Sequence, residues 1–327
     1  MTPETLAALR YAGLDAGEVG RVVAAALDED FRYGPDVTSA ATVAGRALTA
    51  DVVARQAGVL AGVPVALAVL DLAPGAGNGD SAGAAGTMLV PDGARIAPGD
   101  AVLRVSGPAT AVLGAERTML NFLTRLSGIA TATRAWADAV AGTGAVIRDT
   151  RKTTPGLRAV EKYAVRCGGG ENHRMGLGDA ALIKDNHVAA AGGVARAVAA
   201  VRSAAAGVPL EVECDSLPQV RQALAAGARF LLLDNMGVGA LREAVAAARA
   251  YAGVRLEASG GLRLATAREV ALTGVDYLSV GALTHSSPAL DLGLDVVEPL
   301  PNRPRDQLLV VSRRGDERRL RRTFPGR

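Results

Sequence analysis

The sequence has 327 residues, of which 49% are hydrophobic and 3% aromatic, and its formal net charge is +3. This length predicts one large domain beside a smaller one. A core of Ala, Val and Leu favours packed helices and buried parallel strands over an all-β sandwich. No apolar run is long enough to cross a bilayer, so we expect no membrane span. Two cysteines cannot form a disulfide framework, which indicates a cytoplasmic protein.

The first part of the chain contains both helical and alternating, strand-like hydrophobic patterns. Helical periodicity is expected over residues 6–14 and 18–29, and alternating segments follow at 46–62 and 94–107. The Gly/Ala/Ser-rich stretch 74–86 is expected to be a mobile surface loop. A long helical region, 111–141, should join this part to the rest of the chain, with a break at Gly128.

From residue 145 onward, short apolar runs alternate with Ala-rich helical segments. Six strands are predicted, at residues 145–150, 181–186, 209–216, 229–235, 255–261 and 277–283. Strand-helix alternation at this spacing predicts parallel strands with right-handed crossovers. Six polar strand ends on one rim favour an α/β barrel with its functional groups at the carboxyl ends of the strands.

Lysine is rare in this chain and is confined to one segment. Lys152, Lys162 and Lys184 are the only lysines beside 33 arginines, and all three lie within residues 149–187. A lysine that persists in such a composition marks a place where a compact ammonium is needed, although for Lys162, inside a helical pattern, we expect ordinary salt bridging. With Arg151 and Arg174, this segment predicts a site for an anion that carries several charges.

Two other groups of residues complete a predicted sugar-phosphate site. Glu213 and Asp234 end the third and fourth strands and supply hard oxygens suited to Mg²⁺ or sugar hydroxyls. The glycine-rich segments 259–261 and 280–282 follow the last two strands, where barrels commonly bind phosphate. A dinucleotide site is disfavoured, because GLGDAA at 176–181 precedes a strand and Arg242 replaces the third glycine after Gly239.

A set of motifs runs in order along residues 27–295. The segment 149–187 contains DTRKTTPGLR, EKYAV, GGG, NHR, GL and LIKDNH, and the rest of the chain contains LDEDFRYGPDVTS, GAERTMLNFLTRLSGIAT, EVECDS, LLLDNM, EASGG and SVGALTHS. Together they resemble the signature of the quinolinate phosphoribosyltransferases. Loop 74–86 and the tail 303–327 look like additions to the family pattern.

The resemblance implies a fold and an activity. The fold is an N-terminal α/β sandwich domain (1–115), an open, seven-stranded, TIM-like α/β barrel (116–288) and a segment returning to the first domain (289–302). The added basic tail (303–327) is expected from its composition to be disordered. The activity is transfer of phosphoribosyl from phosphoribosyl pyrophosphate (PRPP) to quinolinate with decarboxylation, giving nicotinate mononucleotide, CO₂ and pyrophosphate in NAD biosynthesis. The family also implies a homodimer, or a higher oligomer of dimers, in which Arg117 reaches the partner's site.

The same resemblance implies the roles of individual residues. Those expected to bind quinolinate are Thr150, Arg151, His173, Arg174 and Lys184. Those expected to serve PRPP and Mg²⁺ are Lys152, Glu213 and Asp234, with the two carboxylates as metal ligands. Those expected around the 5-phosphate are Ser259, Gly260, Gly261, Val280, Gly281, Ala282 and His285.

Three alternatives remain at this point. A related phosphoribosyltransferase could use nicotinate or another small anion, although the excess of basic residues favours a dicarboxylate. A catalytically silent binding subunit is disfavoured, because each implied position holds a chemically competent residue. The tail 303–327, with nine arginines and three acidic residues, could bind nucleic acid, but a solvated and disordered extension is the simpler interpretation.

Overall fold

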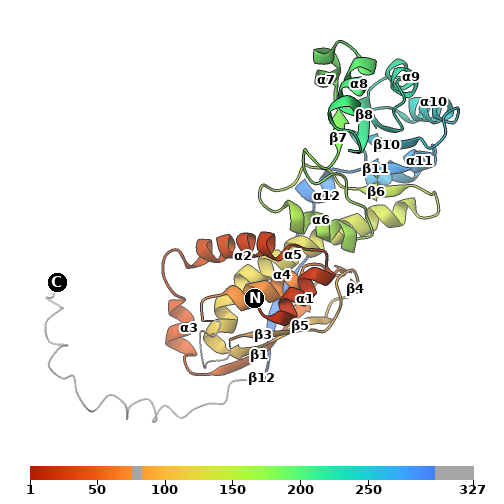
Figure 1. Ribbon diagram of the computed structural model, residues 1–327. Coiled ribbons are helices and arrows are strands. Elements are labelled where there is room, and N and C mark those ends of the chain that lie inside the picture. Colours follow the sequence, from red (N-terminus) through yellow and green to blue (C-terminus); the bar gives the residue numbers. More distant parts are fainter. Residues whose placement is uncertain (76–82, 299–327) are drawn as a thin grey trace, which may run out of the picture.

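The computed structural model describes residues 1–75 and 83–298, and its chain forms two lobes (Figure 1). The N-terminal lobe holds an antiparallel sheet of four strands in the order β12-β1-β5-β3. These strands are β1 (Ala47–Ala54), β3 (Ala85–Met88), β5 (Ala101–Pro108) and β12 (Leu292–Glu298), and a separate ribbon pairs β2 (Gly58–Val59) with β4 (Arg95–Ile96). The predicted tail 303–327 and residues 299–302 of the returning segment lie outside the described residues.

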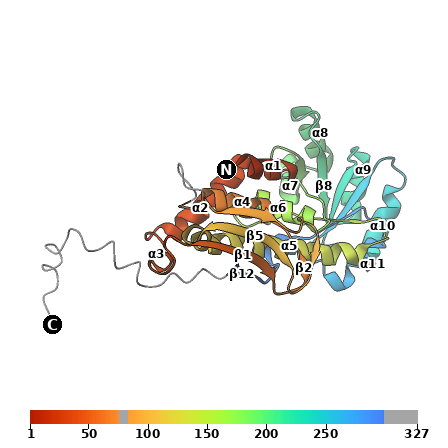
Figure 2. The ribbon, with the colours of Figure 1, turned by 90° about the horizontal axis from the view of Figure 1, so that it is seen from below.

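Helices pack on one side of this sheet, as the view in Figure 2 shows for α2 and α4. The helices of this lobe are α1 (Pro3–Tyr11), α2 (Ala16–Phe31), α3 (Val37–Thr42) and α4 (Val63–Leu72). Val19, Val23 and Leu27 recur every four residues and form the buried face of α2. The N–H groups that begin α4 donate to the Asp92 carboxylate. The predicted α/β sandwich is therefore confirmed.

The loop predicted at 74–86 is partly a strand. β3 begins at Ala85, so the last two residues of that range pair with β5. Residues 76–82 of the loop lie outside the described residues.

One long helix, α5 (Ala109–Val140), passes between the lobes (Figure 1). The predicted break at Gly128 is wrong, because the helix continues through it. The glycine serves close packing instead: a Cβ at Gly128 would lie 2.0 Å from the carbonyl oxygen of Pro288. The segment that leads into β12 therefore runs directly against α5.

The second lobe is built on a parallel sheet with the order β6-β11-β10-β9-β8-β7. Its strands match the six predictions and are β6 (Val146–Arg148), β7 (Ala181–Ile183), β8 (Leu210–Cys214), β9 (Phe230–Asp234), β10 (Arg255–Ser259) and β11 (Tyr277–Ser279). The seventh expected strand is reduced, within the described residues, to a parallel bridge between Arg148 and Glu171 at the β6 edge. The lobe is therefore an open, barrel-like sheet.

Helices cover the outside of the parallel sheet. They are α6 (Arg158–Cys167), α7 (Asp185–Ala191), α8 (Val194–Ala204), α9 (Leu217–Ala225), α10 (Val238–Ala248), α11 (Ala267–Ala271) and α12 (Ala282–His285), with a 3₁₀ turn at Leu264–Thr266. None of the helices in residues 1–75 and 83–298 is both long and apolar enough to span a bilayer. Cys167 and Cys214 are both free.

Candidate active site

A cavity of about 570 Å³ opens at the carboxyl ends of the parallel strands. Its size suits a small-molecule site. The predicted site residues that line it are Thr150, Arg151, Lys152, His173, Arg174, Lys184, Glu213, Asp234, Ser259, Gly260 and Gly261. Because the carboxyl ends of parallel strands meet at one rim, the fold brings together residues that lie more than 100 positions apart in the sequence.

The remaining predicted site residues do not line this cavity. Gly281 lies beside it, because a Cβ there would be 3.1 Å from Lys152 Cδ and 3.2 Å from His285 Nε2. Val280 and Ala282 flank Gly281 at the start of α12. Arg117 is exposed on α5 and is not among the residues that line the cavity.

The cations of the cavity have few internal counter-charges. Lys184 Nζ lies 2.9 Å from Glu213 Oε2. Among the described residues, none forms an ion pair with Arg151, Lys152 or Arg174, and Arg174 only donates to the Ala180 carbonyl, at 2.8 Å. Burial, together with the nearby charge of Arg151, lowers the pKa of Arg174. Cations that have no ion-pair partner among the described residues fit an anionic ligand.

A buried ion pair positions the loop that carries two of these residues. Lys162 and Asp149 have fully buried side chains and contact each other, and Lys162 also donates to the His173 carbonyl, at 2.7 Å. Asp149 accepts from the His173 backbone N–H at 2.8 Å and from Asn172 Nδ2 at 2.6 Å. Lys162 thus forms a salt bridge as expected, but the pair is fully buried and joins α6 to the end of β6 instead of lying along the helix surface. It places His173 and Arg174 beside β6.

Lys162→Met should lower the free energy of unfolding by about 3–5 kcal/mol, because the variant leaves the Asp149 carboxylate buried without its partner. Urea unfolding followed by circular dichroism measures this difference. Arg21→Met is the matched control, since the Arg21 side chain is 74% exposed, and its effect should stay within about 0.5 kcal/mol. Similar small losses in both variants would contradict the structural role of Lys162.

His173 lies in a network of buried residues that the sequence analysis did not identify as site residues. Its Nδ1 accepts from the Arg174 N–H at 2.7 Å, and its Nε2 lies 2.9 Å from Glu211 Oε2 and 3.5 Å from Glu257 Oε1. Glu257 also pairs with Arg148 at 2.6 Å and accepts from Ser279. Glu211 and Glu257 precede Glu213 and Ser259 by two residues on their strands, and the period of two could have placed them on the same face.

His173, Glu211 and Glu257 hold possible metal ligand atoms within 4.8 Å of one another. None of these three residues is one of the predicted metal ligands, which are Glu213 and Asp234. Because Nδ1 of His173 accepts a hydrogen bond, the ring proton lies on Nε2, which therefore donates to the carboxylates and has no lone pair for a metal. We interpret the cluster as a hydrogen-bonded support. Burial raises the pKa of Glu211 to about 7.

His173 should stay neutral to a lower pH than an ordinary histidine, whose pKa is about 6.5. Burial lowers its pKa, and the attraction of Glu257 offsets this only in part. A lowered pKa means that the neutral ring persists as the pH falls through the usual range. Long-range ¹H–¹⁵N spectra should show the Nε2–H tautomer, with His173→Asn identifying the signal among three histidines. A ring that becomes doubly protonated at or above the ordinary histidine pKa would contradict this assignment.

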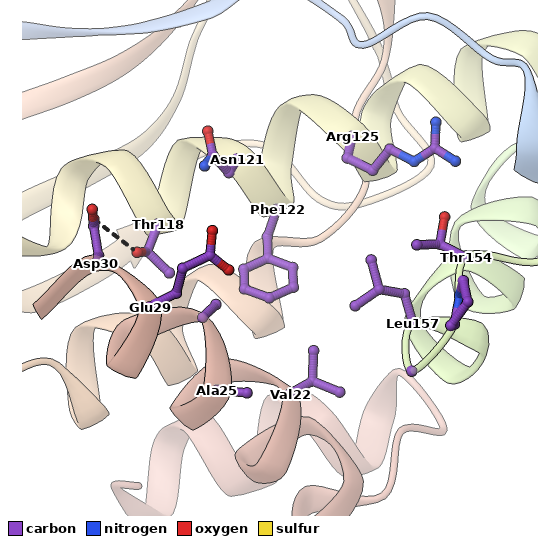
Figure 3. Close-up of a pocket in the computed structure, with 13 residues that line it drawn as sticks. Val22, Ala25, Glu29, Asp30, Thr118, Asn121, Phe122, Arg125, Thr154 and Leu157 are labelled. Atoms are coloured by element: carbon purple, nitrogen blue, oxygen red, sulfur yellow. Dashed lines mark hydrogen bonds between the residues drawn. The ribbon is translucent and has the colours of Figure 1, made fainter. Parts of the chain in front are cut away.

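A second cavity, of about 460 Å³, lies between α2, α5 and the loop after Lys152 (Figure 3). Phe122 and Leu157 make part of its wall apolar. Its cation, Arg125, is neutralised by the buried Glu161 at 2.9 Å and donates to the Ser287 carbonyl at 3.0 Å. Since the free cations and the strand-end carboxylates lie in the other cavity, the candidate active site is there.

Comparisons with known proteins show the family of this chain. The family models for the N-terminal and C-terminal domains of quinolinate phosphoribosyl transferase match residues 36–127 and 129–295. The nicotinate-nucleotide pyrophosphorylase (carboxylating) of Mycobacterium leprae is 56% identical over 273 residues, which are 83% of this chain and 94% of that protein. Its human counterpart is 43% identical over 223 residues, 66% of this chain and 75% of that protein.

Solved structures extend the similarity to three dimensions. The nicotinate-nucleotide pyrophosphorylase of Francisella tularensis has a TM-score of 0.80 at 37% identity, over 86% of this chain and 97% of that chain. The enzyme from Streptococcus pyogenes has a TM-score of 0.79, also at 37% identity, over 87% and 99% of the two chains. This chain therefore belongs to the quinolinate phosphoribosyltransferase family.

Proposed function

We propose that this protein transfers phosphoribosyl from PRPP to quinolinate and releases CO₂ and pyrophosphate, forming nicotinate mononucleotide in NAD biosynthesis. The observation that carries the proposal is the cavity itself. It is lined by Arg151, Lys152 and Arg174, which have no ion-pair partner in residues 1–75 and 83–298, together with the carboxylates of Glu213 and Asp234. This arrangement fits an anionic acceptor beside a sugar-phosphate donor.

Quinolinate would bind at the cationic side of the cavity. Arg151 and Arg174 can each hold a carboxylate through two parallel hydrogen bonds, and the ammonium of Lys184, paired with Glu213, lines the same cavity. Thr150 supplies a hydroxyl. His173, with both ring nitrogens engaged within the protein, offers an uncharged ring surface. The cavity therefore has more cations than a single carboxylate would need, which favours a substrate with two carboxylates.

PRPP would bind across the carboxylate and glycine-rich sides, with Lys152 at its phosphates. Glu213 pairs in register with Leu232 on β9, and Asp234 lies two residues further on the same face, so both carboxylates point into the cavity. Two hard oxygen donors fit Mg²⁺, which keeps several waters and substrate oxygens as its other ligands. When bound there, Mg²⁺ would neutralise charge on the departing pyrophosphate.

The chemistry follows from how these residues hold the two substrates. The cationic side orients quinolinate so that its ring nitrogen attacks C1 of the ribose, and the C1–O bond breaks with its electron pair leaving on pyrophosphate. Carboxylate oxygens nearby stabilise the positive charge that develops on the ribose. The pyridinium then stabilises the electron pair left at C2 as CO₂ departs, and C2 takes up a proton.

We also propose that the active unit is a homodimer, or an oligomer of such dimers, and that Arg117 completes the partner subunit's quinolinate site. Arg117 is exposed on α5 and does not line the cavity of its own chain. An arginine at that position is available to a second subunit.

The test is an assay of the purified protein with PRPP, Mg²⁺ and either quinolinate or nicotinate, following ¹⁴CO₂ from carboxyl-labelled quinolinate and the mononucleotide by chromatography. We expect equal amounts of CO₂ and nicotinate mononucleotide from quinolinate, and none after removal of Mg²⁺ with EDTA. Product from nicotinate alone would overturn the substrate. No product from either acid would overturn the activity.

A further inference from the structure

Asn235 has an unusual backbone conformation in the candidate active site. It directly follows Asp234 at the end of β9 and lines the cavity. Its φ of 55° is the only positive φ of a non-glycine residue in the described part of the chain. Asparagine tolerates this left-handed region better than most residues, and such conformations gather at functional sites.

The side chain of Asn235 contacts two parts of the proposed PRPP site at once. Its Nδ2 donates to Asp234 Oδ2 at 2.7 Å. Its amide also packs on Gly260, because a Cβ at Gly260 would lie 2.3 Å from Asn235 Oδ1. In addition, the Asn235 backbone N–H donates to the Ser259 carbonyl at 2.9 Å. One residue therefore links the carboxylate that ends β9 to the glycine-rich turn that follows β10.

We propose that Asn235 is a positioning residue that sets the separation between the carboxylate and phosphate halves of the PRPP site. This inference rests on the proposed function. PRPP carries its pyrophosphate and its 5-phosphate on the same ribose, so both halves of the site must be held at a matching distance. Asp234 and the Gly260 turn belong to neighbouring strands, and Asn235 is the side chain that lies between them.

The identity of the residue follows from this role. Glycine would accept the backbone conformation but would lack the amide. Aspartate would keep the shape, but its carboxylate would face Asp234 and repel it. Asparagine combines a tolerated left-handed backbone with a donor for Asp234 and a flat group that fits against Gly260.

Asn235→Gly and Asn235→Asp form a matched pair that tests the proposal. Loss of a hydrogen bond to a charged group should raise the KM for PRPP about tenfold in Asn235→Gly, and Asn235→Asp should raise it further because of charge repulsion. The KM for quinolinate and the Tm should stay close to wild type in Asn235→Gly, since the cationic side of the cavity and the backbone are kept.

An unchanged KM for PRPP in both variants would overturn the proposal, as would equal rises in both KM values, which indicate general damage to the site. Calorimetry with PRPP and Mg²⁺ separates this failure from failure of the proposed function. If the wild-type protein binds PRPP but forms no nicotinate mononucleotide, the function fails. The weaker PRPP binding of Asn235→Gly would still support the role of Asn235.

Discussion

Arg174→Ala should weaken quinolinate binding about 100-fold or more, while PRPP binding stays within about threefold of wild type. Arg174 faces the cavity without an ion-pair partner among the described residues, and its guanidinium is held by a hydrogen bond to the Ala180 carbonyl. Its removal would leave one substrate carboxylate unpaired in a partly buried site. Calorimetric titrations of the variant with each substrate measure the two effects separately.

Arg10→Ala is a suitable control for this experiment, because Arg10 is exposed on α1 and does not line the cavity. It should leave both affinities unchanged. Equal weakening of quinolinate and PRPP binding in Arg174→Ala would contradict the assignment of Arg174 to quinolinate. If only PRPP binding weakens, Arg174 belongs to the PRPP side of the cavity, and the assignment of the two sides is reversed.

The strand ends were predictable because parallel strands obey a simple rule. Continuous apolar runs that finish in polar residues must place those residues on one edge of the sheet. Lys184, Glu213, Asp234 and Ser259 follow this rule, and all of them line the cavity. Local sequence was sufficient here because the position of each side chain depends on its own strand.

Other features could not be predicted, because they depend on what packs against them. Gly128 signals a helix break by its intrinsic preference, but close contact with the Pro288 carbonyl is the reason for a glycine there. The period of two could have placed Glu211 and Glu257 on the same face as Glu213 and Ser259, but their contact with His173 depends on the fold. The apolar pattern predicts only six strands, because the single bridge at Glu171 leaves no apolar run in the sequence.

Arg117 should act in the site of the other subunit, and subunit mixing can show this directly. Arg117→Ala and Arg174→Ala should each be nearly inactive alone. If Arg117 crosses the interface, a mixed dimer has one site with both defects and one intact site. Random reassociation of a 1:1 mixture, in which half of the dimers are mixed, should therefore recover about one quarter of wild-type activity.

Arg174→Ala mixed with Lys184→Ala is the matched control. Both residues line the cavity of their own chain, so every site in that mixture keeps at least one defect and activity should not return. Arg117 differs from them in its exposed position on α5, outside the lining of its own cavity. If the mixture of Arg117→Ala with Arg174→Ala behaves like the control, the proposal that Arg117 completes the partner subunit's site is wrong. Recovery in the first mixture alone would mean that a monomer of this chain holds an incomplete active site.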